Sequence, residues 1–247
     1  AAVDVADFFL QSGSLVVSTR GNAVGEDYYY TTGRQTFNGD LILLVDGGSA
    51  SSSEIVAGAL QDNNAAILIG SRTYGKGSVQ TLMDLGEFPN LGHYGVKLTT
   101  ARYFTPDGRS IDRTLNDEFL TGSEDTLENW GIVPDITVEM REVSGSLPIE
   151  LYAASVFFNY ATDYVLEHDI DADFWPDSSC VSEFRNYLTE EGFEWEDGEF
   201  SDNLFYIERS LFTEIAARTW DREMYYRMMT PHDETVQRAL QYFRDGE

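Results

Sequence analysis

The chain has 247 residues, of which 42% are hydrophobic and 13% aromatic, so one large domain or two small ones with a sizeable core are expected. Its 43 acidic and 16 basic residues give a formal net charge of −27, and a surface of this charge repels nucleic acid and anionic membranes. No apolar run approaches the about 20 residues of a membrane span, and a single cysteine, Cys180, excludes an internal disulfide.

The acidic residues lie among aromatic and periodic apolar residues, unlike those of a disordered acidic tail. A composition rich in acids and poor in lysine fits adaptation to high salt, where screening relieves the repulsion between like charges. We therefore hypothesise a halophilic source. The three histidines are far apart in the sequence and no calcium-binding loop pattern is present, so we predict neither a metal site nor a cofactor.

The first part of the chain alternates between short apolar segments and polar turns. Apolar residues at helical spacing predict helices, whereas short apolar or alternating runs predict strands. In chain order, the predicted elements are a helix over 1–10, strands over 15–20 and 41–45, a helix from about residue 52, and strands over 65–69, 78–84, 95–104 and 131–138. The acidic residues of 112–129 indicate a solvated loop.

The pattern changes after Ser144-Gly145-Ser146, where aromatic-rich segments with helical spacing begin. In order, the predicted segments are a long helix over 147–169, shorter segments over 174–198, a long helix over 203–229 and a last amphipathic turn or two over 236–243. We therefore expect an α/β domain over residues 1–143, followed by an all-helical region over residues 144–247. The helical region carries no chemistry that its residues identify.

The stretch from residue 46 to residue 80 carries groups suited to catalysis. A strand ends at Gly47-Gly48, and Ser51 stands where the next helix begins, so its hydroxyl faces outward beside the N–H groups of the helix start. A second strand is followed by Lys76, which lies between two glycines and is one of only two lysines in the chain. A lysine acts as the base for a serine when burial favours its neutral form, whereas an arginine stays charged.

The same residues also fit a structural interpretation. Ser49, Ser51, Ser52 and Ser53 form a helix-capping cluster in this view, and Glu54 completes a capping box. A Gly-Lys-Gly segment alone usually marks a surface turn. The joint order and spacing of the motifs favour the catalytic interpretation.

Four segments in the same order, over about 140 residues, resemble the C-terminal processing (tail-specific) proteases. They are GSASSSEIVAGALQD, YGKGSVQ, KLTTARYFTPDGRSI and GIVPDI. The resemblance implies an α/β, crotonase/ClpP-like fold of strand-strand-helix units and a Ser/Lys dyad, with Ser51 as the nucleophile and Lys76 as the base. It further implies that Gln80 orients the amine and that the backbone N–H of Ser52 is one oxyanion donor. Asp62 matches a family position with a structural role.

In that family, a glycine-rich segment and a PDZ-like substrate-binding domain precede the helix that residues 1–10 resemble. The glycine-rich segment supplies the second oxyanion N–H, so a missing N-terminal half or another polypeptide, as in a homo-oligomer, is expected to complete the site. The activity implied by the resemblance is endoproteolysis of unfolded or C-terminally exposed proteins near their C-termini, without a cofactor. The resemblance also implies an extracytoplasmic location, in the periplasm or the cell envelope.

Two other functions compete with this interpretation. A Ser-His-Asp hydrolase would pair Ser51 with His93, but the expected loop position of His93 has no evident carboxylate to orient its ring. A non-catalytic binding module would resemble the retinoid-carrying relatives of the fold that lack protease activity. The joint presence of Ser51, Lys76 and Gln80 argues against such a module.

Overall fold

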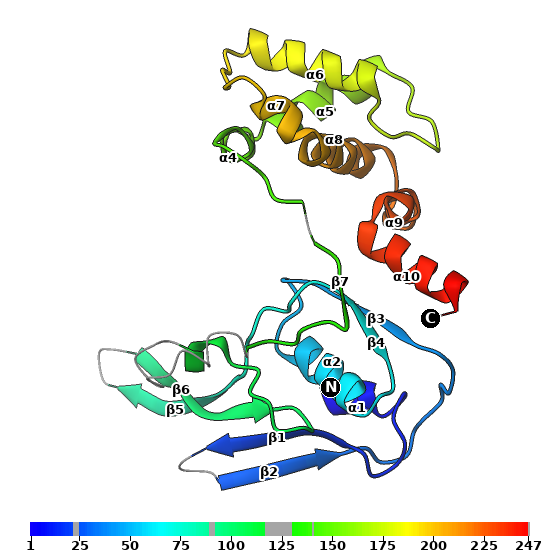
Figure 1. Cartoon of the computed structure of the whole chain (residues 1–247). Helices are drawn as coiled ribbons and strands as arrows, with labels where there is room; N and C mark the ends of the chain where they lie inside the picture. Colours follow the sequence, from blue (N-terminus) through cyan, green and yellow to red (C-terminus); the bar gives the residue numbers. More distant parts are fainter. Residues whose placement is uncertain (22–24, 89–91, 117–129, 140, 247) are drawn as a thin grey trace. The chain divides into compact units, whose positions relative to one another are not determined.

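A computed structural model describes every residue except 22–24, 89–91, 117–129, 140 and 247 (Figure 1). The chain divides into two compact units: unit 1 is formed by Ala1–Glu139 with Arg238–Glu247, and unit 2 by Met140–Gln237. Unit 1 contains two β-sheets with helices, and unit 2 consists of helices in the part that the structure describes. The prediction of an α/β core followed by a helical region is confirmed, whereas the domain boundary at residue 143 stays a prediction.

The first sheet of unit 1 is antiparallel, with the strand order β2-β1-β6-β5. Its strands are β1 (Leu15–Gly21), β2 (Gly25–Tyr30), β5 (Ser78–Phe88) and β6 (Gly92–Phe104). β5 and β6 form a hairpin in which an irregularity at Leu85 lets the pairing continue to Phe88 and Gly92. The predicted strands over 78–84 and 95–104 are therefore too short. As a result, His93 lies in a strand and not in a loop.

The second sheet is parallel, with the order β3-β4-β7. Its strands are β3 (Ile42–Val45), β4 (Ile67–Gly70) and β7 (Ile136–Thr137). Helix α2 (Ser52–Asp62) connects β3 to β4, since parallel neighbours require a crossover. The predicted strand over 131–138 is wrong outside β7. The Ile132 N–H there donates to the Thr73 hydroxyl at 2.7 Å, and Pro134 has no N–H to pair.

Helices α1 (Ala2–Ala6) and α2 pack against each other and against β1 (Figure 1). Their apolar faces join a core that also takes side chains from the strands and loops of unit 1. Its most buried members are Ala6, Leu10, Val16, Ala57, Ala59, Leu60, Leu68, Ile111 and Ile132. The core therefore holds α2 along its length, so the first turn of this helix starts from a rigid element.

Asp7 follows α1 and binds a later loop. Its Oδ1 accepts the N–H groups of Thr32 (2.8 Å), Gly33 (2.9 Å) and Arg34 (3.3 Å), and its Oδ2 accepts the Thr32 hydroxyl. The hydroxyl hydrogen bond outweighs the opposing effect of burial and, with the N–H groups, lowers the pKa of Asp7 from 3.8 to about 2. The carboxylate thus fixes residues 32–34 against the end of the helix.

The C-terminal end of α2 is tied to the turn that follows β6. One carboxylate oxygen of Asp62 pairs with Arg109, and the other accepts the Asp107 N–H at 3.0 Å. Gln61 accepts a hydrogen bond from Arg109 at 3.0 Å and donates one to Asp135 Oδ1 at 2.9 Å. These contacts give Asp62 a structural role, because they hold the Pro-Asp-Gly turn against the helix.

Unit 2 is built from helices around an aromatic core. The helices are α4 (Leu147–Ala153), α5 (Val156–Glu167), α6 (Ser178–Glu190), α7 (Glu199–Asp202), α8 (Leu204–Thr219) and α9 (Arg222–Met229). The last helix, α10 (Glu234–Asp245), begins in unit 2, and its residues from Arg238 onward belong to unit 1. α5 packs against α8, and Phe157 stacks on Phe184 with 5.1 Å between ring centres. Across the described residues, every helix is too short or too polar to span a lipid bilayer.

Helix α6 departs from the short segments that were predicted over 174–198. Asp177 caps this helix, because its Oδ1 accepts the N–H groups of Ser179 (2.9 Å) and Cys180 (3.0 Å). Pro176 and Gly192 interrupt the apolar pattern, but they lie outside the helix on either side. The predicted acidic loop over 112–129 lies mostly outside the described residues, and its first part forms a 3₁₀ turn over Arg113–Asn116.

Candidate active site

The predicted nucleophile stands at a sharp turn between β3 and α2. Asp46 directly follows β3, and its Oδ1 accepts the N–H groups of Gly48 and Ser49, each at 3.0 Å, which closes the turn. Ser51 is the N-cap residue of α2 and has a φ of 56° and a ψ of −112°. A residue with a side chain rarely adopts this conformation, and strain of this kind concentrates at functional sites.

The helix start beside Ser51 supplies N–H donors. Ser52 is the first residue of α2, and the first N–H groups of a helix have no acceptors within the helix. Together with the helix dipole, these groups favour negative charge at this end. The Ser52 N–H therefore has the position expected of an oxyanion donor, and this role stays a prediction.

Glu54 joins the two segments that carry the predicted dyad. Its side chain is fully buried. Oε2 accepts the backbone N–H groups of Ser51 and Lys76, each at 2.8 Å. Oε1 accepts the Gly75 N–H and the Thr73 hydroxyl, each at 2.6 Å. One buried carboxylate, satisfied by four donors, thus holds the turn of Ser51 next to the turn of Lys76.

Thr73 orients this carboxylate. Its buried hydroxyl donates to Glu54 and accepts the Ile132 N–H, while its own N–H donates to the Ile132 carbonyl at 3.1 Å. Sequence reasoning assigned Glu54 to helix capping alone and did not single out Thr73. The serine-glutamate spacing signals the cap, but no local pattern signals a partner 19 residues away.

Lys76 lies in the turn before β5, and its side chain is open to solvent, unlike the buried lysine that the sequence argument favoured. The glycines on either side are required by packing. A Cβ atom at Gly75, where φ is +81°, would lie 2.7 Å from the Trp130 ring. A Cβ atom at Gly77 would collide with the Asp112 backbone nitrogen. The Gly-Lys-Gly segment therefore runs too close to its neighbours to carry further side chains.

Gln80 lies on β5 opposite Thr99 of β6, and its side chain is exposed. Among the described residues, it makes no side-chain hydrogen bond to Ser51 or Lys76. The structure thus brings the segments of Ser51 and Lys76 together through Glu54, whereas within the described residues no hydrogen bond links the Gln80 side chain to either. The orienting role of Gln80 stays a prediction.

His93 lies far along the hairpin of β5 and β6. It is paired with Glu87, nine residues along β5 from Ser78, which corresponds to roughly 30 Å of strand. Its Nε2 lies 2.8 Å from Asp84 Oδ1, so the expectation that no carboxylate orients this ring is wrong. Both side chains are exposed, and their distance along the hairpin from the Lys76 turn argues against His93 as the base.

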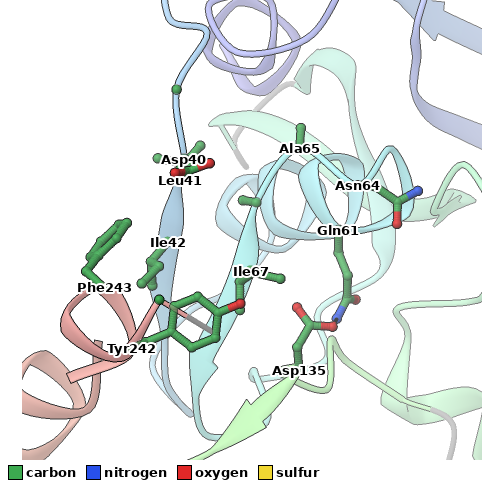
Figure 2. Close-up of a pocket in the computed structure, with 13 residues that line it drawn as sticks. Asp40, Leu41, Ile42, Gln61, Asn64, Ala65, Ile67, Asp135, Tyr242 and Phe243 are labelled. Carbon is green, nitrogen blue, oxygen red and sulfur yellow. Dashed lines mark hydrogen bonds between the residues drawn. The ribbon is translucent and has the colours of Figure 1, made fainter. Parts of the chain in front are cut away.

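A cavity of about 430 Å³ lies in unit 1 beside β3 and β4 (Figure 2). Its labelled lining residues are Asp40, Leu41, Ile42, Gln61, Asn64, Ala65, Ile67, Asp135, Tyr242 and Phe243. The lining includes neither Ser51, Lys76 nor Gln80, so this cavity does not mark the predicted site. Among the described residues, no group of three or more His, Cys, Asp or Glu side chains is arranged to hold a metal ion.

Comparisons with known proteins find relatives of the first part of the chain. The model of the family described as Peptidase family S41 matches residues 1–138. A carboxy-terminal-processing protease of Bartonella bacilliformis is 43% identical over 140 residues, which are 56% of this chain and 27% of that protein. Carboxyl-terminal-processing peptidase 3, chloroplastic, of Arabidopsis thaliana is 33% identical over 174 residues, which are 70% of this chain and 30% of that protein.

A solved structure of a photosystem II D1 C-terminal processing protease is also similar. It is 33% identical, covers 56% of this chain and 30% of its own, and has a TM-score of 0.44. The chain thus spans less than a third of the length of each of these relatives. The family match includes every predicted site residue and ends before unit 2 begins.

Proposed function

Because the chain belongs to peptidase family S41, we propose that it carries the catalytic residues of a serine endopeptidase that cleaves proteins near their C-termini. Ser51 is the nucleophile and Lys76 is the base. Gln80 orients the amine, and the backbone N–H of Ser52 is an oxyanion donor. The reaction needs no cofactor, because a serine, a neutral amine and backbone donors suffice for acyl transfer.

The reaction forms and then hydrolyses an ester on the enzyme. Lys76 is exposed in this structure, so we propose that bound substrate covers its side chain and favours the neutral amine. This amine takes the proton of Ser51 Oγ as the oxygen attacks the peptide carbonyl carbon. The carbonyl oxygen becomes an oxyanion, which the Ser52 N–H stabilises. Lys76 then passes its proton to the leaving amine, which releases the C-terminal fragment. Lys76 then takes a proton from water as the water oxygen attacks the ester carbon. It passes this proton to Ser51 Oγ as the ester C–O bond breaks, which releases the N-terminal fragment with a new carboxyl group and restores the Ser51 hydroxyl.

The observation that supports this proposal most is the sharing of one Glu54 oxygen by the N–H groups of Ser51 and Lys76. A helix cap needs only the bond to Ser51. The bonds from Glu54 to Lys76, Gly75 and Thr73 have no use in capping. They do hold the segments of nucleophile and base at a fixed separation, which acyl transfer requires.

The relatives described above are named as carboxyl-terminal-processing enzymes, so we propose unfolded or exposed C-terminal tails as substrates. An extracytoplasmic location is proposed from the family and from the chloroplastic relative. Residues 1–143 would form the catalytic domain, and residues 144–247 a helical region without catalytic side chains. Nucleic acid is not an expected partner, because a net charge of −27 repels phosphate.

The proposal is tested by cleavage of an unfolded protein with a free apolar C-terminus, using the full-length gene product in molar salt from about pH 5 to about pH 10. Ser51→Ala and Lys76→Arg are each expected to lower kcat by about a thousandfold or more. Lys97→Arg is the matched control, because Lys97 is the other lysine of the chain and lies exposed on β6. It is expected to retain the wild-type kcat.

Activity retained by Lys76→Arg would contradict the dyad, because a guanidinium stays protonated throughout this pH range. Loss of activity in His93→Ala, together with tolerance of Lys76→Ala, would instead indicate a Ser-His-Asp hydrolase. Tight binding of an unfolded tail without cleavage would favour a non-catalytic binding module.

A further inference from the structure

Tyr74 and Arg113 form a pair of side chains beside the predicted dyad. The Tyr74 N–H donates to the Ser49 carbonyl at 2.9 Å, so Tyr74 adjoins the turn of the nucleophile. The Arg113 N–H donates to the Gly75 carbonyl at 3.0 Å, so Arg113 adjoins the residue that precedes Lys76. Both residues are thus attached through their backbones to the segments that carry the dyad.

The Arg113 guanidinium is held in place by the Tyr74 side chain. Its central carbon lies 4.1 Å from the centre of the Tyr74 ring, and Nη2 donates to the Tyr74 hydroxyl at 2.8 Å. Both side chains are exposed. A guanidinium has five N–H donors, so further donors remain for a ligand. Because the side chain is already positioned, little conformational entropy is lost when a ligand binds.

The neighbouring arginines are engaged with other groups. Arg102 pairs with the buried carboxylate of Asp112 at 3.1 Å. The central carbon of the Arg72 guanidinium lies 5.0 Å from the centre of the Trp130 ring, and Arg72 Nη1 donates to the Trp130 carbonyl at 3.1 Å. Within the part of the chain that the structure describes, no carboxylate forms an ion pair with Arg113. Arg113 therefore presents a positive charge beside the site in a chain whose net charge is −27.

We propose that Arg113, held by Tyr74, binds a carboxylate of the peptide substrate close to the scissile bond and so determines which substrates are cleaved. The proposal rests on the endopeptidase function proposed above. A planar guanidinium binds a carboxylate through two parallel hydrogen bonds. A strongly negative chain repels anionic peptides, so a carboxylate binds near the site only where a local cation such as Arg113 attracts it. The carboxylate belongs either to the C-terminus of the substrate or to an Asp or Glu side chain near the cleaved bond.

Three peptides of otherwise identical sequence separate these two sources. The first has neutral side chains and an amidated C-terminus, the second has a free C-terminal carboxylate, and the third is amidated but carries one Asp beside the cleavage site. The full-length protein is assayed for kcat/KM with each peptide, at the lowest salt concentration in which it stays folded. Ser51→Ala and the double variant Ser51→Ala/Arg113→Gln are assayed for Kd by fluorescence anisotropy, a readout that does not depend on turnover.

We expect the wild type to prefer at least one carboxylate peptide over the neutral peptide by about tenfold in kcat/KM. In Arg113→Gln this preference is expected to disappear, while the neutral peptide is cleaved within about twofold of the wild-type rate. Arg227→Gln, the matched control, removes an exposed arginine of α9 and is expected to keep the preference.

Equal kcat/KM and Kd for all three peptides in the wild type would overturn the proposal, as would an unchanged preference in Arg113→Gln. A preference in Kd that depends on Arg113, without cleavage of any peptide, would support the carboxylate site and refute the endopeptidase function. The failures of the two proposals are therefore distinguishable.

Discussion

Thr73 and Glu54 are joined by a hydrogen bond of 2.6 Å inside unit 1, and both side chains are fully buried. The Thr73 hydroxyl has one proton, and its oxygen accepts the Ile132 N–H at 2.7 Å, so the proton points at Glu54. Glu54 therefore acts here as an acceptor. Its remaining lone pairs accept the N–H groups of the two segments that carry the proposed dyad.

The substitution Thr73→Val keeps the size of the side chain and removes its hydroxyl. We expect the free energy of unfolding to fall by about 1–3 kcal/mol, because the Ile132 N–H and one Glu54 oxygen lose a buried partner. Thr73→Ser keeps the hydroxyl and is expected to cost about 1 kcal/mol, the contribution of one methyl group. Urea denaturation measures the free energy of unfolding of both variants, and wild-type stability in Thr73→Val would show that the hydroxyl contributes nothing.

The substitution Glu54→Gln replaces one acceptor oxygen by an NH₂ group, which then opposes donors of the protein. We expect kcat to fall by about a hundredfold, because a displacement of the dyad by about 1 Å has this effect. Glu223→Gln, at an exposed position of α9, is the matched control and is expected to leave kcat unchanged. Wild-type kcat in a folded Glu54→Gln variant would exclude a positioning role for Glu54.

Gly75 and Gly86 have the same φ of +81°, but only Gly75 is crowded. A Cβ atom at Gly86 would meet no atom within 4 Å, whereas one at Gly75 would lie 2.7 Å from the Trp130 ring. Gly86→Ala is expected to cost about 1–2 kcal/mol of stability for the backbone conformation alone. Gly75→Ala is expected to cost about 1–3 kcal/mol more, because of overpacking. Thermal denaturation measures the stability of the two variants, and an equal loss of stability in both would contradict the crowding at Gly75.

The pKa of Asp7 gives the stability of unit 1 a dependence on acidity. In the folded chain this pKa is about 2, below its ordinary value of 3.8, so the ionised carboxylate stabilises the fold. The contribution is fully present above about pH 4 and is lost as the pH falls towards 2. We therefore expect Asp7→Asn to have a lower free energy of unfolding than the wild type at neutral pH. This difference is expected to shrink as the pH falls from about 4 to about 2. A difference that stays constant down to pH 2 would contradict the assignment.

The net charge of −27 predicts that salt stabilises the folded chain. We expect Tm to rise by about 10 °C between about 0.05 M and about 2 M KCl, because screening weakens the repulsion between acidic side chains. Sucrose is the control, since it favours the compact state without screening charge. A chain that is fully stable in millimolar salt would remove the support for a halophilic source.

The strands β3 and β4 and helix α2 were predictable because their signals are local. Apolar runs, glycine pairs and a serine-glutamate cap each act within a few residues. The short β7 was not predictable, since its length depends on a hydrogen bond from Ile132 to a distant threonine. Helix α6 is longer than the segments predicted over 174–198, because Pro176 and Gly192 lie outside it and Asp177 caps its start.

The part of the candidate site that depends on the order of sequence motifs was predictable. Ser51 and Lys76 follow from two motifs, each at the end of an apolar run. The bonds from Glu54 to the second motif cross up to 22 residues, and the contact of Arg113 with Tyr74 crosses 39. Such contacts depend on how the strands and turns pack, and no periodicity in the sequence encodes them.

The single buried carboxylate between the two turns has a consequence for how the site is lost. If either turn opens, the buried Glu54 carboxylate loses one or more of its four donors, and we expect this unsatisfied carboxylate to weaken the other turn as well. We therefore expect the geometry of the candidate site to be lost in the same transition as the packing of β3, α2 and β4. If the proposed peptidase function is right, we expect activity and folded structure to be lost over the same temperature range.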